Sequence, residues 1–362
     1  MKNTFGQSIS VTIFGESHGM EIGVVIDGLA PGIEVDSDFI SSQLDLRRPY
    51  GRISTSRCEE DNLRIVSGVF DGKTCGTPIC ILIPNNDTKS RDYASTRFLA
   101  RPGHADYTAN CKYHGFEDYR GGGHFSGRIT APLVAAGAIA LSALSKKGIY
   151  IGTHISECAG ISDRKFNDLS VDIKNLSKKK FAVLSDEKAS QMEEAIVLAA
   201  NDGDSVGGIL ETAVTGMPAG VGEPWFDSVE SVLSHILFSI PGIKGVQFGL
   251  GFDFAHKRGS EANDSFYSDN GTVKTVTNNN GGINGGITNG MPIVFSCVVK
   301  PTPTIYKTQK TVDFNTIENA EITAKGRHDP AIIHRARVVV DSVTALALCD
   351  MLAIRFGTDW LK

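Results

Sequence analysis

The sequence predicts a mixed fold of the α/β (α+β) class. We expect its strands and helices to form a layered sandwich built from two related units. Apolar, β-branched runs typical of strands alternate with segments in which apolar residues recur at helical spacing. In addition, IGVVIDGLAPG at 22–32 is echoed by GGILETAVTGMPAG at 207–220, and GTPICILI at 76–83 is echoed by GMPIVFSC at 290–297. Two such strand–turn–helix–strand units, packed together, predict an internal two-fold pseudo-repeat.

The elements follow from these patterns. The β-branched runs predict strands at 9–14, 22–27, 63–70, 79–83, 149–155, 208–214, 245–252 and 292–299. Helical spacing predicts helices at 38–46, 129–146, 186–200, 228–239 and 342–356. Ser185 and the later Asp202-Gly203 are start and stop signals for the third of these helices. The lysine-rich stretch 163–180 is expected to be an exposed excursion, and the Gly- and Asn-rich stretch 278–290 a set of tight turns or a backbone close to a ligand.

Composition indicates a globular protein with its own core. The chain has 362 residues, of which 41% are hydrophobic and 21% are charged, and its net charge is −5. We therefore expect residues 1–362 to form a single domain. The apolar stretch 129–144 is interrupted by Pro132 and Gly137 and is shorter than the roughly 20 apolar residues of a membrane span. We therefore expect a buried core helix and no membrane association.

The N-terminus and the cysteines point to the cytoplasm. The first residues lack the basic-then-apolar pattern of a signal peptide. Seven cysteines form an odd set without a CxxC pair, which argues against a zinc site or a disulfide framework. We expect no metal ion.

Arginines are concentrated in the first third of this acidic chain, at Arg47, Arg48, Arg52, Arg57, Arg64, Arg91, Arg97, Arg101, Arg120 and Arg128. Arginine is suited to bidentate contact with phosphate and carboxylate. These arginines therefore either bind a local anionic ligand or are scattered over a solvated surface. Net acidity and the lack of interleaved aromatic residues argue against nucleic-acid binding.

The segment TIFGESHG at 12–19 ends an apolar run at Gly15 and crowds Glu16, Ser17 and His18 into one turn. A histidine there can carry a proton near neutral pH. The alternative is a structural turn with a hydrogen-bonded histidine.

Two further segments combine arginine with turn residues. DLRRPYGRISTSR at 45–57 spaces its arginines too irregularly for one helix face, so we expect a folded loop that either is solvated or clamps an acidic substrate. RPGHAD at 101–106 sets Arg101 and His104 on either side of a Pro-Gly turn, which makes His104 a candidate general acid.

Glycines mark another segment, DYRGGGHFSGRITA at 118–131. Three glycines lead into the predicted buried helix, with Ser126 near its start and Arg128 in its first turn. Helix N-termini offer free N–H groups to a phosphate. The spacing matches neither the dinucleotide-binding GxGxxG nor the P-loop, and a single RGG is weak evidence for RNA contact.

The last candidates are KPTPT at 300–304 and KGRHDP at 325–330. The first extends a strand into a Pro-rich turn that carries Lys300 and Thr304. The second sets Arg327, His328 and Asp329 on a turn closed by Pro330, which is also the composition of a surface loop that satisfies its own hydrogen bonds.

In order along the chain, these segments, together with IDGLAPG, the segment at 203–208, KGVQFGLGF and GGITNG, resemble the chorismate synthase family from Thr12 to Pro330. The resemblance implies conversion of 5-enolpyruvylshikimate 3-phosphate to chorismate by 1,4-anti elimination of phosphate, with reduced FMN required although the reaction is redox-neutral. Reduced flavin would donate an electron transiently and recover it as a ring proton is removed. The implied fold is a β-α-β sandwich, with helices packed between antiparallel sheets, assembled as a homotetramer.

The resemblance also assigns roles. His18 and His104 would be the protonating histidines, and Asp329 would assist proton removal. The substrate would be held by Arg47, Arg48, Arg52, Arg101 and Arg128. The FMN site would be lined by His124, Phe125, Ser126, Gly127, Gly286, Lys300, Pro301, Thr302, Pro303, Thr304 and Arg327.

The chain departs from the family in one place. Many members read RGGGRSSARET where this chain reads RGGGHFSGRIT, so His124, Phe125, Gly127 and Ile129 differ while Ser126 and Arg128 are kept. We expect altered packing around the flavin and retained activity. An NAD(P)H-dependent flavin reductase or oxidoreductase using the same pocket is the alternative function. Family members reduce their flavin either with NADPH or through a separate flavin reductase, and the sequence leaves both routes open.

Overall fold

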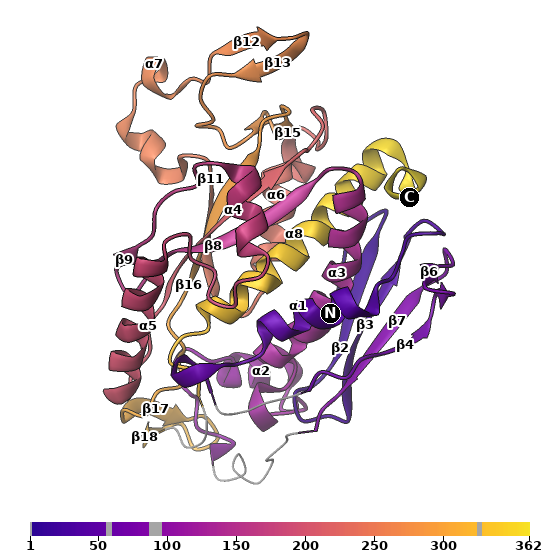
Figure 1. The fold of residues 1–362 in the computed structure, drawn as a ribbon. Helices are drawn as coiled ribbons and strands as arrows, with labels where there is room; N and C mark the ends of the chain where they lie inside the picture. The colour runs from indigo at the N-terminus through magenta and orange to yellow at the C-terminus, as the bar shows by residue number, and fades with distance from the viewer. Residues whose placement is uncertain (1, 56–59, 87–95, 324–327) are drawn as a thin grey trace.

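Two five-stranded antiparallel sheets enclose helices in the computed structural model, which describes residues 2–55, 60–86, 96–323 and 328–362 (Figure 1). The first sheet has the strand order β1-β2-β3-β7-β4, and the second has the order β11-β16-β10-β8-β9. Helix α3 lies against the first sheet, α6 and α8 lie against the second, and α1 packs on α3 and α8. This arrangement confirms the predicted sandwich.

The strands of the first sheet are β1 (Thr4–Phe5), β2 (Ser10–Gly15), β3 (Glu21–Asp27), β4 (Arg64–Ser67) and β7 (Ile79–Pro84). Those of the second are β8 (Tyr150–Cys158), β9 (Ile161–Ser162), β10 (Gly208–Thr215), β11 (Ile243–Phe248) and β16 (Ile293–Val299). Short hairpins are formed by β5 (Val69–Phe70) with β6 (Lys73–Thr74), β12 (Phe266–Asp269) with β13 (Thr272–Thr275), β14 (Ile283–Asn284) with β15 (Ile287–Thr288), and β17 (Gln309–Asp313) with β18 (Glu318–Ile322).

The α-helices are α1 (Ser37–Arg47), α2 (Asp106–Tyr113), α3 (Thr130–Lys146), α4 (Leu169–Leu176), α5 (Asp186–Asn201), α6 (Val229–Leu237), α7 (Gly259–Ala262) and α8 (Ile333–Phe356). Several of these helices have a short polar side chain as the N-cap residue. Asp36 accepts the backbone N–H groups of Asp38 and Phe39 at the start of α1, and Ser185 accepts that of Lys188 at the start of α5, as predicted. Such caps satisfy donors that have no partner within the helix.

The two halves share one topology, which supports the predicted pseudo-repeat. In the first, β2, β3, α1, β4, β7 and α3 follow in chain order, and in the second β8, β10, α6, β11, β16 and α8 do so with the same neighbours in the sheet. The echoed segments fall on matching strands. In each half, a Gly-x-Pro segment directly precedes the strand, β7 or β16. The first residue of that strand pairs with the other echoed segment: Ile79 pairs with Ile26, and Ile293 pairs with Val214.

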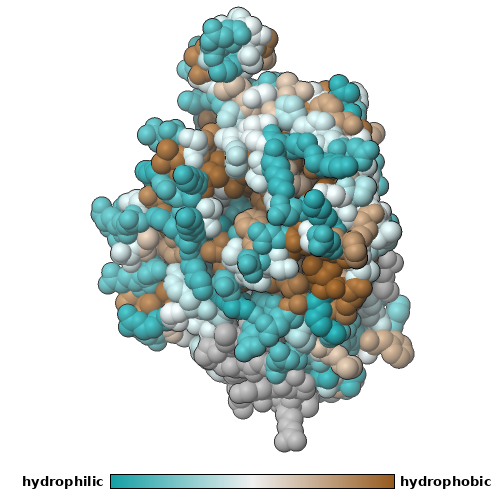
Figure 2. Space-filling model, turned by 45° about the vertical axis from the view of Figure 1, so that its right-hand side comes forward, coloured by the Kyte–Doolittle hydropathy of each residue, from teal (hydrophilic) through white to brown (hydrophobic). Residues whose placement is uncertain are grey.

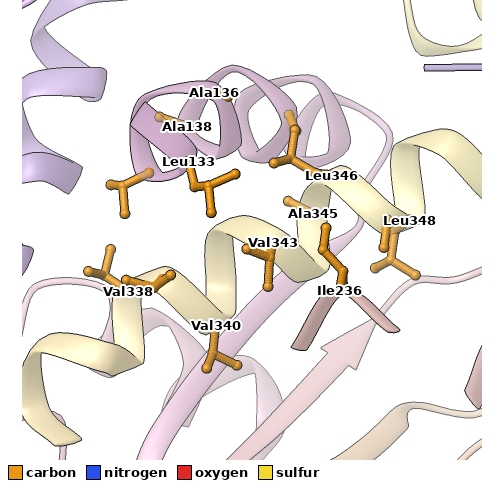
Figure 3. Packing of buried hydrophobic residues seen from close by; sticks show 14 of the residues in the cluster. Leu133, Ala136, Ala138, Ile236, Val338, Val340, Val343, Ala345, Leu346 and Leu348 are labelled. Atoms are coloured by element: carbon orange, nitrogen blue, oxygen red, sulfur yellow. The ribbon is translucent and has the colours of Figure 1, made fainter. Parts of the chain in front are cut away.

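The core lies where α3 crosses α8. Figure 3 shows Leu133, Ala136 and Ala138 of α3 beside Val343 and Leu346 of α8, with Ile236 of α6 nearby. A Cβ at Gly137 would overlap Ser342 of α8, so glycine permits this close approach.

By length and composition alone, one helical segment in the described part of the chain, Gly127–Lys146, is apolar enough to cross a membrane. Within the fold, 78% of its most apolar window is buried, as expected for a core helix.

Some predicted boundaries were wrong. The last helix begins at Ile333, well before residue 342, because burial among strands and helices stabilises a run of β-branched residues that has low intrinsic helix propensity. The strand predicted at 63–70 is interrupted at Gly68, which has a φ of 80°. The strand predicted at 245–252 spans Ile243–Phe248 and ends before Gly249, which has a φ of 54°.

The stretch 163–180 is more than an exposed excursion, because it contains α4. Asp168 caps this helix by accepting the N–H groups of Ser170 and Val171. Ile173 and Leu176 are buried, and Ile173 packs over Gly152 on the outer face of the second sheet. Apolar residues at helical spacing therefore overrode the polar composition.

A buried histidine of β8 connects the second sheet to the segment that leads into α4. His154 of β8 has Nδ1 2.9 Å from Asp163 Oδ2 and Nε2 2.9 Å from Glu211 Oε2. Carboxylates only accept hydrogen bonds, so both ring nitrogens must donate and the ring is an imidazolium. Burial alone would lower the pKa of His154, but its hydrogen bonds to Asp163 and Glu211 outweigh burial and raise the pKa.

This cluster predicts a pH dependence of stability. Because the pKa of His154 is higher in the folded state, its stabilising contribution is complete below the unfolded-state value near 6.5 and is lost as the pH rises through the folded value. Urea unfolding from pH 6 to pH 9 should show a fall in the free energy of unfolding that is smaller in His154→Gln. Identical slopes for the two proteins would contradict this assignment.

Candidate active site

A cavity of about 700 Å³ gathers segments that are far apart in the sequence. Its wall is formed by the end of α1, the turn before α2, the glycine turn before α3, the segments following α6 and β16, and the start of α8. The predicted site residues in this wall are Arg47, Arg48, Arg101, His104, His124, Phe125, Ser126, Gly127, Arg128, Lys300, Pro301, Thr302, Pro303, Thr304 and Asp329. Cavities of this volume are typical of ligand and cofactor sites.

Three other predicted residues are not part of the wall as the described residues form it. His18 lies behind it, Arg52 is exposed in a 3-10 turn (Gly51–Ile53), and Gly286 lies in the β14–β15 turn. A Cβ at Gly286 would clash with Glu223 O and Ser228, so this glycine permits a close backbone contact within the chain. Arg327 lies outside the described residues.

The His18 turn is interlocked with the glycine turn. Ser17 N donates to Gly123 O at 3.1 Å, and Ser17 Oγ donates to Gly121 O at 3.1 Å. Gly121 has a φ of 60°, and a Cβ at this position would overlap the imidazole of His18. His18 is therefore held directly behind Gly121, which itself lines the cavity.

His124 adds a further hydrogen bond between the glycine turn and the end of β2. Its Nδ1 lies 2.8 Å from Gly15 O, so this ring nitrogen carries the proton and donates. The neighbouring Phe125 is 43% exposed and packs edge-on against Tyr113 at a centroid distance of 6.1 Å. Two of the four residues that depart from the family pattern thus have different roles: His124 links two turns by a hydrogen bond, and Phe125 presents an aromatic ring at the cavity.

His104 lies among cations. Its Nε2 forms a short hydrogen bond with Thr304 Oγ1. Burial lowers the pKa of His104, and the positive charges of Arg101 and Lys300 lower it further against the opposing effect of Asp106, to about 4. The ring is neutral at pH 7 in the unliganded protein. An anion bound beside it would offset those cations and favour the protonated form.

Arg101 and Lys300 are both oriented by neighbours. Arg101 makes a bidentate ion pair with Asp106, with Nε 2.8 Å from Oδ2 and Nη2 2.7 Å from Oδ1. Lys300 Nζ donates to Gly103 O at 2.6 Å. Burial and the nearby Lys244 lower the pKa of Lys300. These contacts bring the KPTPT segment against the RPGHAD turn.

Arg47 and Arg128 share one buried carboxylate, that of Asp61. Arg128 Nη1 forms a short ion pair with Asp61 Oδ1, and Arg47 Nη1 lies 3.6 Å from Asp61 Oδ2. Arg47 also donates to Thr130 Oγ1 at 2.9 Å and to Gly127 O at 2.7 Å. Burial and the neighbouring Arg335 lower the pKa of Arg47 to about 9. This triad keeps an excess of positive charge in the wall.

Asp329 is paired with Arg335 and with the backbone of Thr55. Its Oδ2 accepts Arg335 Nη1 at 2.6 Å, and its Oδ1 accepts Thr55 N at 2.9 Å. Arg335 Nε in turn donates to Arg47 O at 2.9 Å. Asp329 is thereby fixed beside the arginines of α1.

Four buried side-chain atoms of the described wall residues have no hydrogen-bond partner: the carboxylate oxygens Asp61 Oδ2 and Glu117 Oε2, and two possible donors, Arg48 Nε and Thr302 Oγ1. Unsatisfied buried donors are costly, which makes these two donors candidates for contact with a bound molecule. Arg48 also pairs with Asp45 through Nη1, so its guanidinium is held in place while its Nε–H is available to a ligand.

Sequence patterns missed three contributors: Asp61, Asn85 and Arg335. Asp61 bridges Arg47 and Arg128, Asn85 contacts Arg128, and Arg335 pairs with Asp329. Asp61 and Asn85 lie in unremarkable local contexts, and only Arg335, which closely follows GRHDP, carried a sequence signal. The segment 238–244 also lines the cavity and was predicted only as the end of a helix and an approach to a strand.

Charge and shape suit a ligand with several negative groups. The wall's cations, Arg47, Arg48, Arg97, Arg101, Arg128, Arg335, Lys244 and Lys300, outnumber its carboxylates, Asp61, Asp106, Glu117, Asp118 and Asp329. Such an excess in a partly buried site favours binding of anions. Within the described residues, no group of three or more His, Cys, Asp or Glu side chains has the arrangement of a metal site.

Comparison with known proteins gives a consistent result over nearly the whole chain. The sequence profile of the family described as chorismate synthase matches residues 9–353. The chain is 45% identical over 351 residues to chorismate synthase of Pyrococcus abyssi, covering 97% of each chain. It is 46% identical over 352 residues to that of Chitinophaga pinensis, again covering 97% of each. A crystal structure of chorismate synthase superposes with a TM-score of 0.75 at 27% identity, covering 97% of this chain and 94% of the other.

Proposed function

This chain belongs to the chorismate synthase family and is a lyase of chorismate biosynthesis in the shikimate pathway, and we propose that its substrate is 5-enolpyruvylshikimate 3-phosphate. The proposed reaction is the 1,4-anti elimination of phosphate. The observation that carries the proposal is the convergence of arginines from α1, the RPGHAD turn and the SGR segment on one cavity with His104 and Asp329. The comparisons give no support to the alternative of a flavin reductase.

We propose that the substrate's carboxylates and phosphate bind to Arg47, Arg48, Arg52, Arg101 and Arg128. The unpartnered Nε of Arg48 supports direct contact with the substrate. Arg101 and Arg128 already hold carboxylates of the chain, so their contact with substrate would be added to these ion pairs. Arg52 would have to turn inward from its exposed position.

We propose that reduced FMN shares the cavity. The unpartnered Thr302 Oγ1 and the positive charge of Lys300 and Lys244 fit an anionic, polar cofactor. The proposed contacts are His124, Phe125, Ser126, Gly127, Lys300, Pro301, Thr302, Pro303 and Thr304, with Arg327 and Gly286 reaching the flavin from outside the described wall. When bound, reduced FMN supplies an electron transiently.

Three residues would manage the protons. His104, among cations, becomes a donor as the bound phosphate raises its proton affinity. His18, behind Gly121, is the second donor. Asp329, held by Arg335 and Thr55 N, assists removal of the ring proton.

We propose a homotetramer, in which the β12–β13 hairpin contacts another copy. The hairpin projects from the body (Figure 1), and Figure 2 shows it as a separate knob at the top of the molecule. Phe266 and Val273 on it are 62% and 64% exposed. Isolated two-stranded hairpins are marginally stable, and exposed aromatic residues mark contact surfaces.

The remaining proposals concern context. We propose that residues 1–362 act as one domain, supported by a hydrophobic core that includes residues from both sheets. We also propose a cytoplasmic location, with NADPH or a separate flavin reductase as the source of electrons for FMN.

An anaerobic assay tests the function. The protein is mixed with reduced FMN and 5-enolpyruvylshikimate 3-phosphate, and both phosphate and chorismate are followed. Both should appear in equal amounts, and absence of phosphate release would overturn the proposed substrate. A parallel reaction with oxidised FMN and NADPH should yield chorismate only if the chain reduces its own flavin, and added flavin reductase distinguishes the external route.

A further inference from the structure

We propose that Asn85 is a positioning residue that fixes the turn carrying His18 relative to Arg128; this inference rests on the proposed function of both residues. Asn85 directly follows β7. Its backbone N–H donates to Met20 O at 3.1 Å, which places the side chain beside the turn between β2 and β3.

The primary amide of Asn85 bonds in three directions. Its Nδ2 donates to Glu16 O at 3.0 Å and to Gly19 O at 2.9 Å, and its Oδ1 accepts Arg128 Nε at 3.0 Å. The opposite amide orientation would set Oδ1 against two carbonyl oxygens and Nδ2 against a guanidinium. A carboxylate or a hydroxyl of similar length does not provide two donors and one acceptor in this arrangement.

The two carbonyls that Asn85 holds lie on either side of His18. Glu16 O also accepts Gly19 N at 3.0 Å, which closes the turn. Asn85 thus clamps both ends of the turn, while Gly121 backs the ring of His18.

On its other side, Asn85 meets the arginine network. Arg128 Nη2 donates to Pro84 O at 3.0 Å and Nη1 pairs with Asp61, which reaches Arg47 at 3.6 Å. The three groups around the Arg128 guanidinium fix its plane. A continuous set of contacts therefore runs from the His18 turn through Asn85 to the arginines of the cavity wall, and a shift of the turn would change the distance from His18 to the bound phosphate or flavin.

Asn85→Asp is the informative substitution. It keeps the size of the side chain and the acceptor for Arg128, but it replaces the two donors with a carboxylate oxygen facing Glu16 O and Gly19 O. We expect kcat to fall roughly 10- to 100-fold, in line with the effect of a displacement of about 1 Å, with little change in KM. Asn201→Asp, the same chemical change at the exposed end of α5, serves as the control and should retain wild-type kcat.

A double-mutant cycle with His18→Ala distinguishes positioning from general destabilisation. If Asn85 acts through His18, Asn85→Asp should lower kcat much less in the His18→Ala background than in the wild type. An equal loss in both backgrounds, or a wild-type kcat for Asn85→Asp, would overturn the inference. Asn85→Ser, which removes the same clamp with a smaller neutral side chain, replaces Asn85→Asp if that variant does not fold, and the same two outcomes decide.

The wild-type enzyme separates this inference from the proposed function. Absence of chorismate in the wild-type reaction overturns the function, whereas an active wild type with unaffected Asn85 variants overturns only the positioning role.

Discussion

Replacement of His104 by alanine is expected to lower kcat about 10²- to 10⁴-fold, the usual contribution of a general acid or base. His104 lies in the cavity wall next to Arg101 and Lys300, with Nε2 bonded to Thr304. Removing the ring removes the proposed donor to the departing phosphate but leaves the arginines that bind the substrate. The change should therefore appear in kcat more than in KM, measured by anaerobic chorismate formation.

The matched control is His256→Ala, because His256 is exposed and lies outside the cavity wall. It should retain wild-type turnover. An NMR titration adds an independent test: the pKa of His104 is about 4 without ligand, and inorganic phosphate should raise it. A wild-type kcat in His104→Ala would show that this histidine transfers no proton in the rate-limiting step.

Gly121→Ala is expected to inactivate the enzyme nearly as fully as His18→Ala. The added Cβ would overlap the imidazole of His18 and approach Ser17 Oγ, so the ring must leave its position behind the cavity wall. The φ of 60° at Gly121 adds a backbone cost of about 1–2 kcal/mol for a residue with a Cβ. Chorismate formation and thermal unfolding should be measured on the same preparation.

Gly148→Ala separates backbone strain from displacement of His18. Gly148 also has a positive φ, of 75°, but a Cβ there meets nothing within 4 Å. Both variants should lose stability, and only Gly121→Ala should lose activity beyond that loss. Equal activity in the two variants would mean that the position of His18 is unimportant for turnover.

The pattern of the sequence predicted much of the sandwich because burial on one face imposes a period that can be read locally. Apolar, β-branched runs located strands such as β3 and β7, and the buried helix α3 was evident from its long apolar run. The wrong boundaries arose where tertiary packing, and not the local pattern, decides the secondary structure. The first part of α8 is rich in valine, and only burial between the two sheets makes it helical.

The candidate site divides in the same way. Histidine, arginine and glycine next to turns marked the GESHG, RPGHAD, RGGG and GRHDP segments, since these residue types have distinctive chemistry. Asp61 and Asn85 carry no such local mark. Their importance comes from where β7 and the loop after α1 end in space, beside Arg128 and Arg47.

By itself, the sequence determined the family, the layered arrangement of strands and helices, and fifteen of the residues that line the cavity. Only the tertiary structure decided how they meet: His18 lies behind Gly121, Arg128 is held by Asn85 and Asp61, and Gly286 is not part of the described cavity wall. The physical reason is that hydrophobic periodicity and residue chemistry are local properties of the chain. Hydrogen bonds and ion pairs between distant segments depend on distances that are set only when both halves pack around α3 and α8.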